Sequence, residues 1–301
     1  MDITLFISSA SNIKNVVSDI SSRVIEELRQ EYPNVKEDFT LFGMLYNITE
    51  ATGRKFIVII DEWDALFREA KEDTELQKEY INFLRGMFKS SWTDKMLEAA
   101  YMTGILPIKK YGSQSAVSDF REYTMLNPKN LAEYVGFTEN EVKMLCEQSQ
   151  MNFDEMKHWY DGYSFRRLKS VYSPNSVMEA IKSGDFESYW TRTETYESLK
   201  IYIELNEDGL KEAIIQMLGG AHIKINVGSF QNDMTNIRVK DDVLTLLVHL
   251  GYLGYDADSE TVFIPNEEVR QEFLLAVTMG GHKEIARMIQ NSDILLEETL
   301  N

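Results

Sequence analysis

Residues 56–62 read Phe56-Ile57-Val58-Ile59-Ile60-Asp61-Glu62, and this stretch decides the fold class of the chain. Five consecutive apolar residues, most of them β-branched, are typical of a strand that is buried on both faces of a parallel sheet. Such a strand delivers the residues that follow it to the carboxyl edge of the sheet, where open α/β folds bind their ligands. The sequence therefore predicts a central strand that ends in two carboxylates at a ligand-binding edge.

The segments around this strand alternate between helical and extended patterns. Apolar residues recur at three- and four-residue spacing in three segments, 13–28, 39–48 and 76–88, which predicts amphipathic helices. Further strands are predicted over 3–7, 99–105 and 120–126. Alternating strands and helices are the pattern of a parallel α/β sheet, which we expect to occupy residues 1–127.

After Pro128 the pattern becomes mainly helical, and we expect a helical lid region over residues 128–205. Thr138 and Glu141 form a predicted capping box, and Asp161-Gly162 predicts a turn that leads into a short hairpin. Further helices are predicted to start at Ser173-Pro174 and to cover 199–205 and 210–218. Residues 206–301 then predict a winged-helix-like module, with a helix over 243–250, strands over 251–255 and 261–264, and a helix over 267–277.

An apolar strand followed by Asp-Glu is the Walker B pattern of nucleotide hydrolases. In that reading Asp61 holds Mg²⁺ and Glu62 activates the attacking water. Thr103 follows the next predicted strand, at the position of a sensor-1 residue that contacts the γ-phosphate. Taken singly, an Asp-Glu pair is more often a strand terminus and a threonine more often a core residue. Their order and helix-length separation favour the nucleotide site.

The phosphate-binding half of such a site is missing from the sequence. A P-loop requires Gly-x-x-x-x-Gly-Lys-Ser/Thr, whose backbone N–H groups and lysine hold the phosphates. No glycine of the 301 residues is followed by lysine and then serine or threonine. We therefore expect this chain by itself neither to bind ATP tightly nor to hydrolyse it.

Several motifs together resemble the AAA-ATPase-like family of bacterial P-loop proteins. They are FIVIIDEWD (56–64), YMTGILPI (101–108), GFTENEV (136–142), WYDGY (159–163), YSPNSV (172–177) and Tyr189-Trp190. Members of this family usually carry a P-loop near the N-terminus and a PD-(D/E)xK nuclease-like domain near the C-terminus. The resemblance implies that residues 1–6 are the family's second strand and that the chain is a fragment lacking the first strand, Walker A and the nuclease-like domain. It implies an ATPase that uses ATP and Mg²⁺ in the intact parent.

Composition narrows the remaining functions. Asp and Glu outnumber Lys and Arg by 49 to 31, so the formal charge is −18 and nucleic-acid binding is disfavoured. The winged-helix-like segment 239–281 is itself acidic, with two basic and eight acidic residues. The start resembles no signal peptide, no stretch is apolar enough to span a membrane, and one cysteine forms no internal disulfide. We expect a cytoplasmic protein.

Arg166 belongs to a local basic cluster with Arg167 and Lys169. A solvated hairpin is the favoured interpretation of this cluster, and contact of Arg166 with nucleotide phosphates as a lid arginine is the functional alternative. A second hypothesis for the whole chain is a non-catalytic module on a degenerate nucleotide-hydrolase fold, which binds a protein partner or a second copy. A third is a carboxylate-based metal hydrolase that uses Asp61, Glu62 and Asp64.

Overall fold

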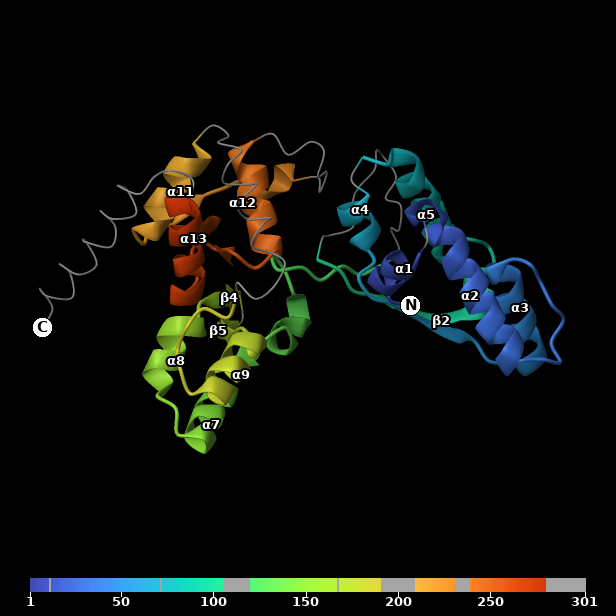
Figure 1. Ribbon diagram of the computed structural model, residues 1–301, viewed down its shortest axis with the longest axis horizontal. Coiled ribbons are helices and arrows are strands. Elements are labelled where there is room, and N and C mark those ends of the chain that lie inside the picture. Colours follow the sequence, from blue (N-terminus) through green and yellow to red (C-terminus); the bar gives the residue numbers. More distant parts are fainter. Residues whose placement is uncertain are drawn as a thin grey trace, which may run out of the picture. The chain divides into compact units, whose positions relative to one another are not determined.

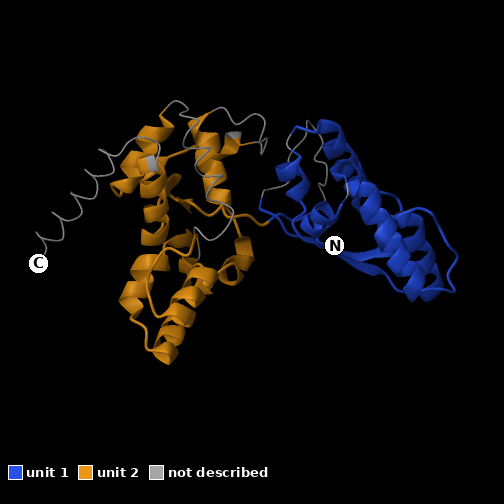
Figure 2. Cartoon of the chain, in the orientation of Figure 1, with its two compact units in different colours: residues 1–122, 231–235 blue, residues 123–230, 236–301 orange. Residues whose placement is uncertain are grey.

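The computed structural model describes residues 1–10, 12–70, 72–105, 120–166, 168–190, 209–230 and 239–279. These residues form two compact units (Figure 2): those up to Glu122 make unit 1, and those from Tyr123 onward make unit 2. The predicted lid region 128–205 and the predicted C-terminal module 206–301 both contribute described residues to unit 2. The predicted helix over 199–205 lies outside the described residues.

Unit 1 is a mixed α/β unit whose helices and strands follow the predicted alternation over most of its length (Figure 1). Its elements are α1 (Ile3–Ser9), η1 (Ile13–Asn15), α2 (Val16–Glu31), α3 (Leu41–Thr52), β1 (Phe56–Ile60), α4 (Ala65–Glu69), α5 (Thr74–Phe88), α6 (Thr93–Met96) and β2 (Leu97–Met102). The helices predicted over 13–28, 39–48 and 76–88 and the strand over 56–60 are confirmed, and the strand predicted over 99–105 begins two residues earlier.

Strands β1 and β2 form a two-stranded parallel sheet in which Ile60 pairs with Met102. Val58 and Ile60 point into the core of unit 1, where they meet buried side chains of α2, α3 and α5. Burial of this single apolar face against amphipathic helices is the main force that holds the unit together.

The opposite face of the sheet differs from the prediction of a strand buried on both sides. Ile57 and Ile59 are 66% and 57% exposed, and Tyr101, which pairs with Ile59, is 58% exposed. The reason is that the described helices of unit 1 cover one face of the sheet only. We refer to Ile57, Ile59 and Tyr101 as the open sheet face.

The strand predicted over 3–7 is wrong, because these residues begin α1. The Asp2 side chain accepts a hydrogen bond from the Leu5 backbone N–H at 3.0 Å, which caps the helix at its N-terminus. Ile3, Phe6 and Ile7 recur at three and four positions and pack toward the core, a helical period that the β-branched composition obscured. Only Met1 and Asp2 are extended, and Asp2 forms a parallel bridge with Asp61.

The third strand, predicted over 120–126, is also absent. Thr124 and Asn127 pair with each other across a tight turn, in which the Asn127 N–H donates to the Thr124 carbonyl at 3.0 Å. Thr124 and Asn127 thus bond to each other rather than to a neighbouring strand, and the segment adds no strand to the described sheet. The sheet is therefore smaller than the sequence predicts.

Unit 2 combines short antiparallel sheets with helices. Its elements are η2 (Lys129–Tyr134), β3 (Phe137–Thr138), α7 (Glu139–Ser149), α8 (Phe153–Tyr160), β4 (Tyr163–Phe165), β5 (Leu168–Tyr172), α9 (Pro174–Ser183), α11 (Leu210–Leu218), β6 (Ile223–Lys224), η4 (Val227–Ser229), α12 (Lys240–His249), β7 (Gly254–Asp256), β8 (Thr261–Phe263) and α13 (Glu267–Met279). The strands form two three-stranded sheets, in the orders β3-β5-β4 and β6-β8-β7.

The local signals of unit 2 are confirmed. Thr138 and Glu141 make a reciprocal capping box at the start of α7, and Ser173 caps α9 with Pro174 in its first turn. The helices predicted over 210–218, 243–250 and 267–277 match α11, α12 and α13, and a hairpin of β7 and β8 lies between the last two. The winged-helix assignment of this segment stays a prediction. Among the described residues, no helix is long and apolar enough to cross a membrane.

Candidate functional site

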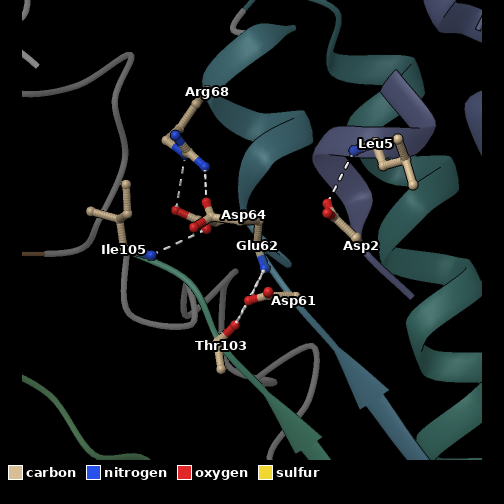
Figure 3. Close-up of polar contacts among 8 residues, drawn as sticks. All are labelled: Asp2, Leu5, Asp61, Glu62, Asp64, Arg68, Thr103 and Ile105. Carbon is tan, nitrogen blue, oxygen red and sulfur yellow. Dashed lines mark hydrogen bonds and ion pairs between the residues drawn. The ribbon is translucent and has the colours of Figure 1, made fainter. Parts of the chain in front are cut away.

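The carboxyl ends of β1 and β2 bring Asp61 and Thr103 together (Figure 3). Backbone hydrogen bonds continue past both strands: the Thr103 N–H, one residue after β2, donates to the Ile60 carbonyl at 2.9 Å, and the Trp63 N–H, three residues after β1, donates to the Thr103 carbonyl at 2.8 Å. Two residues 42 positions apart are thereby held side by side at one edge of the sheet. The parallel register of the two apolar strands is the physical cause of this placement.

Thr103 and Asp61 are joined directly. The Thr103 hydroxyl donates a hydrogen bond to Asp61 Oδ1, and the Glu62 backbone N–H donates to the same oxygen at 3.1 Å. Asp61 is exposed, and no hydrogen bond within the described part of the chain engages its second oxygen, Oδ2. An oriented carboxylate with one oxygen open to solvent is suited to accept a cation or a water molecule.

Glu62 occupies the turn that leaves β1. Its backbone lies in the left-handed region, with φ of 52°, and its carboxylate forms an ion pair with Arg68. Burial raises the pKa of the Glu62 carboxyl above its ordinary value; Arg68 opposes this effect, whereas the carboxylates of Asp64 and Asp61 reinforce it. A non-glycine residue in this backbone conformation is uncommon and is often found at functional sites.

Asp64 serves a different purpose from the one proposed for a three-carboxylate metal site. Its side chain is 1% exposed, Oδ2 lies 3.4 Å from Arg68 Nε, and Oδ1 accepts a hydrogen bond from the Ile105 N–H at 3.2 Å. Within the described ranges, no group of three or more His, Cys, Asp or Glu side chains is arranged to hold a metal ion. Asp64 therefore anchors Arg68 and the segment after β2.

Arg68 is the residue of this site that sequence reasoning missed. It contacts both Glu62 and Asp64 from the short helix α4, so it sets the position of the Glu62 carboxylate. The available signal was its four-residue spacing from Asp64, which places the two side chains on one helical face. Arg166 belongs to unit 2, where it is exposed in the turn between β4 and β5, and its expected contact with nucleotide phosphates stays a prediction.

Comparison with known proteins gives one match. Residues 3–113, less than half of the chain, match the family model described as "Predicted AAA-ATPase". This range contains both strands of unit 1 together with Asp61, Glu62 and Thr103. No curated protein and no solved structure matches the chain. The likeness to an AAA-ATPase-like family therefore applies to the α/β part of the sequence.

Replacing Asp64 with asparagine is expected to destabilise unit 1 by about 2 kcal/mol, because Arg68 loses one of its two carboxylate partners in a largely desolvated position. Urea unfolding followed by hydrogen exchange in α4 and α5 measures this change. The matched control is Glu75→Gln, which removes the exposed Glu75–Lys78 pair and is expected to cost about 0.5 kcal/mol or less. Equal effects of the two substitutions would contradict an anchoring role for Asp64.

Proposed function

We propose that unit 1 belongs to the nucleotide-binding part of an ATP hydrolase, whose phosphate-binding loop is supplied by a segment outside residues 1–301. The observation that carries the proposal is the hydrogen bond between Thr103 and Asp61 across the carboxyl ends of two adjacent parallel strands. It is supported by the match of residues 3–113 to a family described as a predicted AAA-ATPase.

The residues at the sheet edge fit a magnesium–nucleotide complex in part. Mg²⁺ is usually held by one or two carboxylates together with waters and phosphate oxygens, and Asp61 offers one oriented carboxylate with Oδ2 open. When bound, the ion would neutralise charge on the phosphates. The three-carboxylate alternative has less support, since Glu62 and Asp64 both pair with Arg68.

Glu62 and Thr103 have separate roles in this proposal. The raised pKa of Glu62 brings its carboxylate closer to the range in which it accepts a proton from an attacking water. Arg68 acts as a positioning residue, because its ion pair holds that carboxylate. In this proposal the Thr103 hydroxyl, whose one proton goes to Asp61, accepts a hydrogen bond from the attacking water, or rotates to donate to a γ-phosphate oxygen instead.

The outer edge of β2 supports the proposal that a segment outside residues 1–301 adds a strand to this sheet. Thr103 directs its backbone groups toward β1, so the alternate residues Met102, Ala100 and Glu98 direct theirs to the outer edge of β2. Among the described strands, β1 is the one neighbour of β2. A supplied strand would pair with the outer edge of β2, and a helix that follows it would cover the open sheet face. Parallel sheets are ordinarily covered by helices on both faces.

In the intact parent, Glu62→Gln is expected to lower ATP hydrolysis by roughly 100-fold or more while nucleotide binding persists, since the amide accepts no proton. Steady-state hydrolysis and equilibrium binding of a fluorescent ATP analogue measure the two effects. The matched control is Glu79→Gln on the exposed side of α5, which is expected to change neither. Hydrolysis by residues 1–301 themselves, abolished by Glu62→Gln, would refute the need for a supplied phosphate loop.

A non-catalytic interaction module is the second candidate, and the open sheet face favours it specifically. Three large apolar side chains exposed on one sheet are unusual for a surface that meets only water. This candidate predicts that the chain binds a protein partner without nucleotide and that Asp61→Ala leaves the affinity unchanged. Loss of partner binding in that variant would favour the nucleotide-dependent function.

A further inference from the structure

Unit 2 contains a cavity of about 630 Å³ that the proposed function does not use. Its lining residues come from the β4–β5 hairpin, the β7–β8 hairpin and the segment that leads into η2. This volume falls within the range of sites that enclose small molecules. All of its lining residues belong to unit 2, so it is independent of the edge that carries Asp61.

Three cations line the cavity from two separate parts of the chain. Lys129 comes from the first turn of η2, whereas Arg166 and Lys169 come from the hairpin. Within the described part of the chain, neither Arg166 nor Lys169 forms an ion pair or hydrogen bond with a carboxylate. In a chain with 49 acidic and 31 basic residues, a cavity lined by Lys129, Arg166 and Lys169 against Asp256 and Glu260 is a local excess of positive charge, which suits an anionic ligand.

The acidic residues of the cavity wall have partners of their own. Asp256 accepts a hydrogen bond from the Asp258 N–H at 2.9 Å, and this contact is the main cause of its lowered pKa, to which Lys169 adds. Glu260 lies 3.8 Å from the ammonium group of Lys224. Both carboxylates of the wall therefore have contacts within the chain, and Lys129 lies 5.2 Å over the ring of Tyr123. The charged lining as a whole has an excess of cations over carboxylates.

The backbone at two points of the wall is strained. Lys129 has φ of 52° and Glu260 has φ of 55°, both in the left-handed region that non-glycine residues rarely adopt. Strained residues of this kind tend to cluster where a binding or catalytic geometry must be held. Their presence on opposite segments of one cavity is consistent with a wall that is shaped for a ligand.

We propose that this cavity binds a small molecule that carries a phosphate or diphosphate group, held by Arg166 and Lys169 with Lys129 as a third cation. A planar guanidinium engages two phosphate oxygens at once, and lysine adds a further charge. The uncharged lining, which includes Phe165 and Tyr255, provides apolar and hydroxyl surface for the remainder of such a molecule.

The test is calorimetric titration of the full chain with pyrophosphate as the probe. The unmodified chain is expected to bind with a Kd below 1 mM, and Arg166→Gln/Lys169→Gln is expected to weaken binding at least tenfold. The matched control Lys78→Gln/Lys182→Gln removes the same charge from exposed sites outside the cavity and is expected to change the Kd less than twofold. Circular-dichroism melting curves establish that each variant is folded.

Two further measurements test whether the binding is specific to this cavity and to phosphate groups. Glu260→Gln removes a negative charge from the wall and is expected to tighten pyrophosphate binding two- to threefold, a change of sign that damage to the fold would not produce. Citrate is expected to bind at least tenfold more weakly than pyrophosphate. The proposal is overturned if the unmodified chain does not bind, if both double variants weaken binding equally, or if citrate binds more tightly.

Discussion

Replacing Gly162 with alanine is expected to destabilise unit 2 by about 4 kcal/mol, because strain and overpacking act at the same atom. The backbone of Gly162 has φ of +125°, and a Cβ built there would lie 1.8 Å from the carbonyl oxygen of Pro265. The obstacle is backbone rather than a flexible side chain, so it cannot move aside without displacing the segment before α13. Hydrogen exchange in β4, β5 and α13 as a function of urea measures the loss.

Gly184 provides the matched control for this substitution. It also has positive φ, at +81°, but nothing lies within 4 Å of its would-be Cβ. Gly184→Ala is therefore expected to cost only about 1 kcal/mol, which is the intrinsic penalty of the left-handed conformation. If Gly162→Ala costs no more than Gly184→Ala, then the close approach to Pro265 makes no contribution to stability.

The second large effect concerns pH and the buried Glu268 of α13. Its side chain is fully buried, its Oε1 accepts a hydrogen bond from the Tyr189 N–H at 2.8 Å, and burial raises its pKa to about 7. The neighbouring Glu272, which is 3% exposed and accepts a hydrogen bond from Ser188, adds to this rise. Glu268 in turn contributes to the raised pKa values of the Tyr160 and Tyr163 hydroxyls.

The direction in which pH changes stability follows from the protonation of Glu268 in the folded and in the unfolded chain. Between a pH of 4.5 and about 7, the folded chain keeps a proton on Glu268 that the unfolded chain has already lost, so the free energy of unfolding falls as pH rises. The full effect is on the order of 3 kcal/mol and is complete above pH 7. Glu268→Gln is expected to remove this part of the pH dependence in unit 2, as measured by urea unfolding at pH 5 and pH 8.

Glu267→Gln is the control, since the adjacent Glu267 pairs with Arg270 on the surface side of the same helix. It is expected to leave the difference in stability between pH 5 and pH 8 as it is in the unmodified chain. An unchanged pH dependence in Glu268→Gln would mean that the buried carboxyl does not hold its proton in the folded state.

Much of the fold could be predicted from local sequence because the signals and the structure share one physical cause. Helices α2, α3 and α5 carry apolar residues at helical spacing, and each buries that stripe in the core of unit 1. The capping box of Thr138 and Glu141 needs only residues within one turn. Asp61 and Thr103 were likewise predicted at one sheet edge, because each directly follows an apolar strand.

The two strands that were predicted wrongly, over 3–7 and 120–126, share a cause. Each segment contains residues typical of strands, but a local helix cap or turn determines its conformation. The run from Ile3 to Ile7 has strand-like residues, but the Asp2 cap and the burial of Ile3, Phe6 and Ile7 favour a helix. The segment from Phe120 to Leu126 contains aromatic and β-branched residues typical of a strand, yet Thr124 and Asn127 pair with each other across a turn instead. Apolar composition alone cannot decide between these outcomes.

The sequence by itself determined the helices with their caps, strands β1 and β2, and the presence of acidic and hydroxyl residues directly after those strands. Only the tertiary structure decided which neighbours these residues meet. Arg68 pairs with Glu62 and Asp64, and Gly162 lies against Pro265, more than 100 positions away. Hydrophobic period and capping act over one or two turns of chain, whereas the partners of a charge or a close backbone contact depend on how distant elements pack.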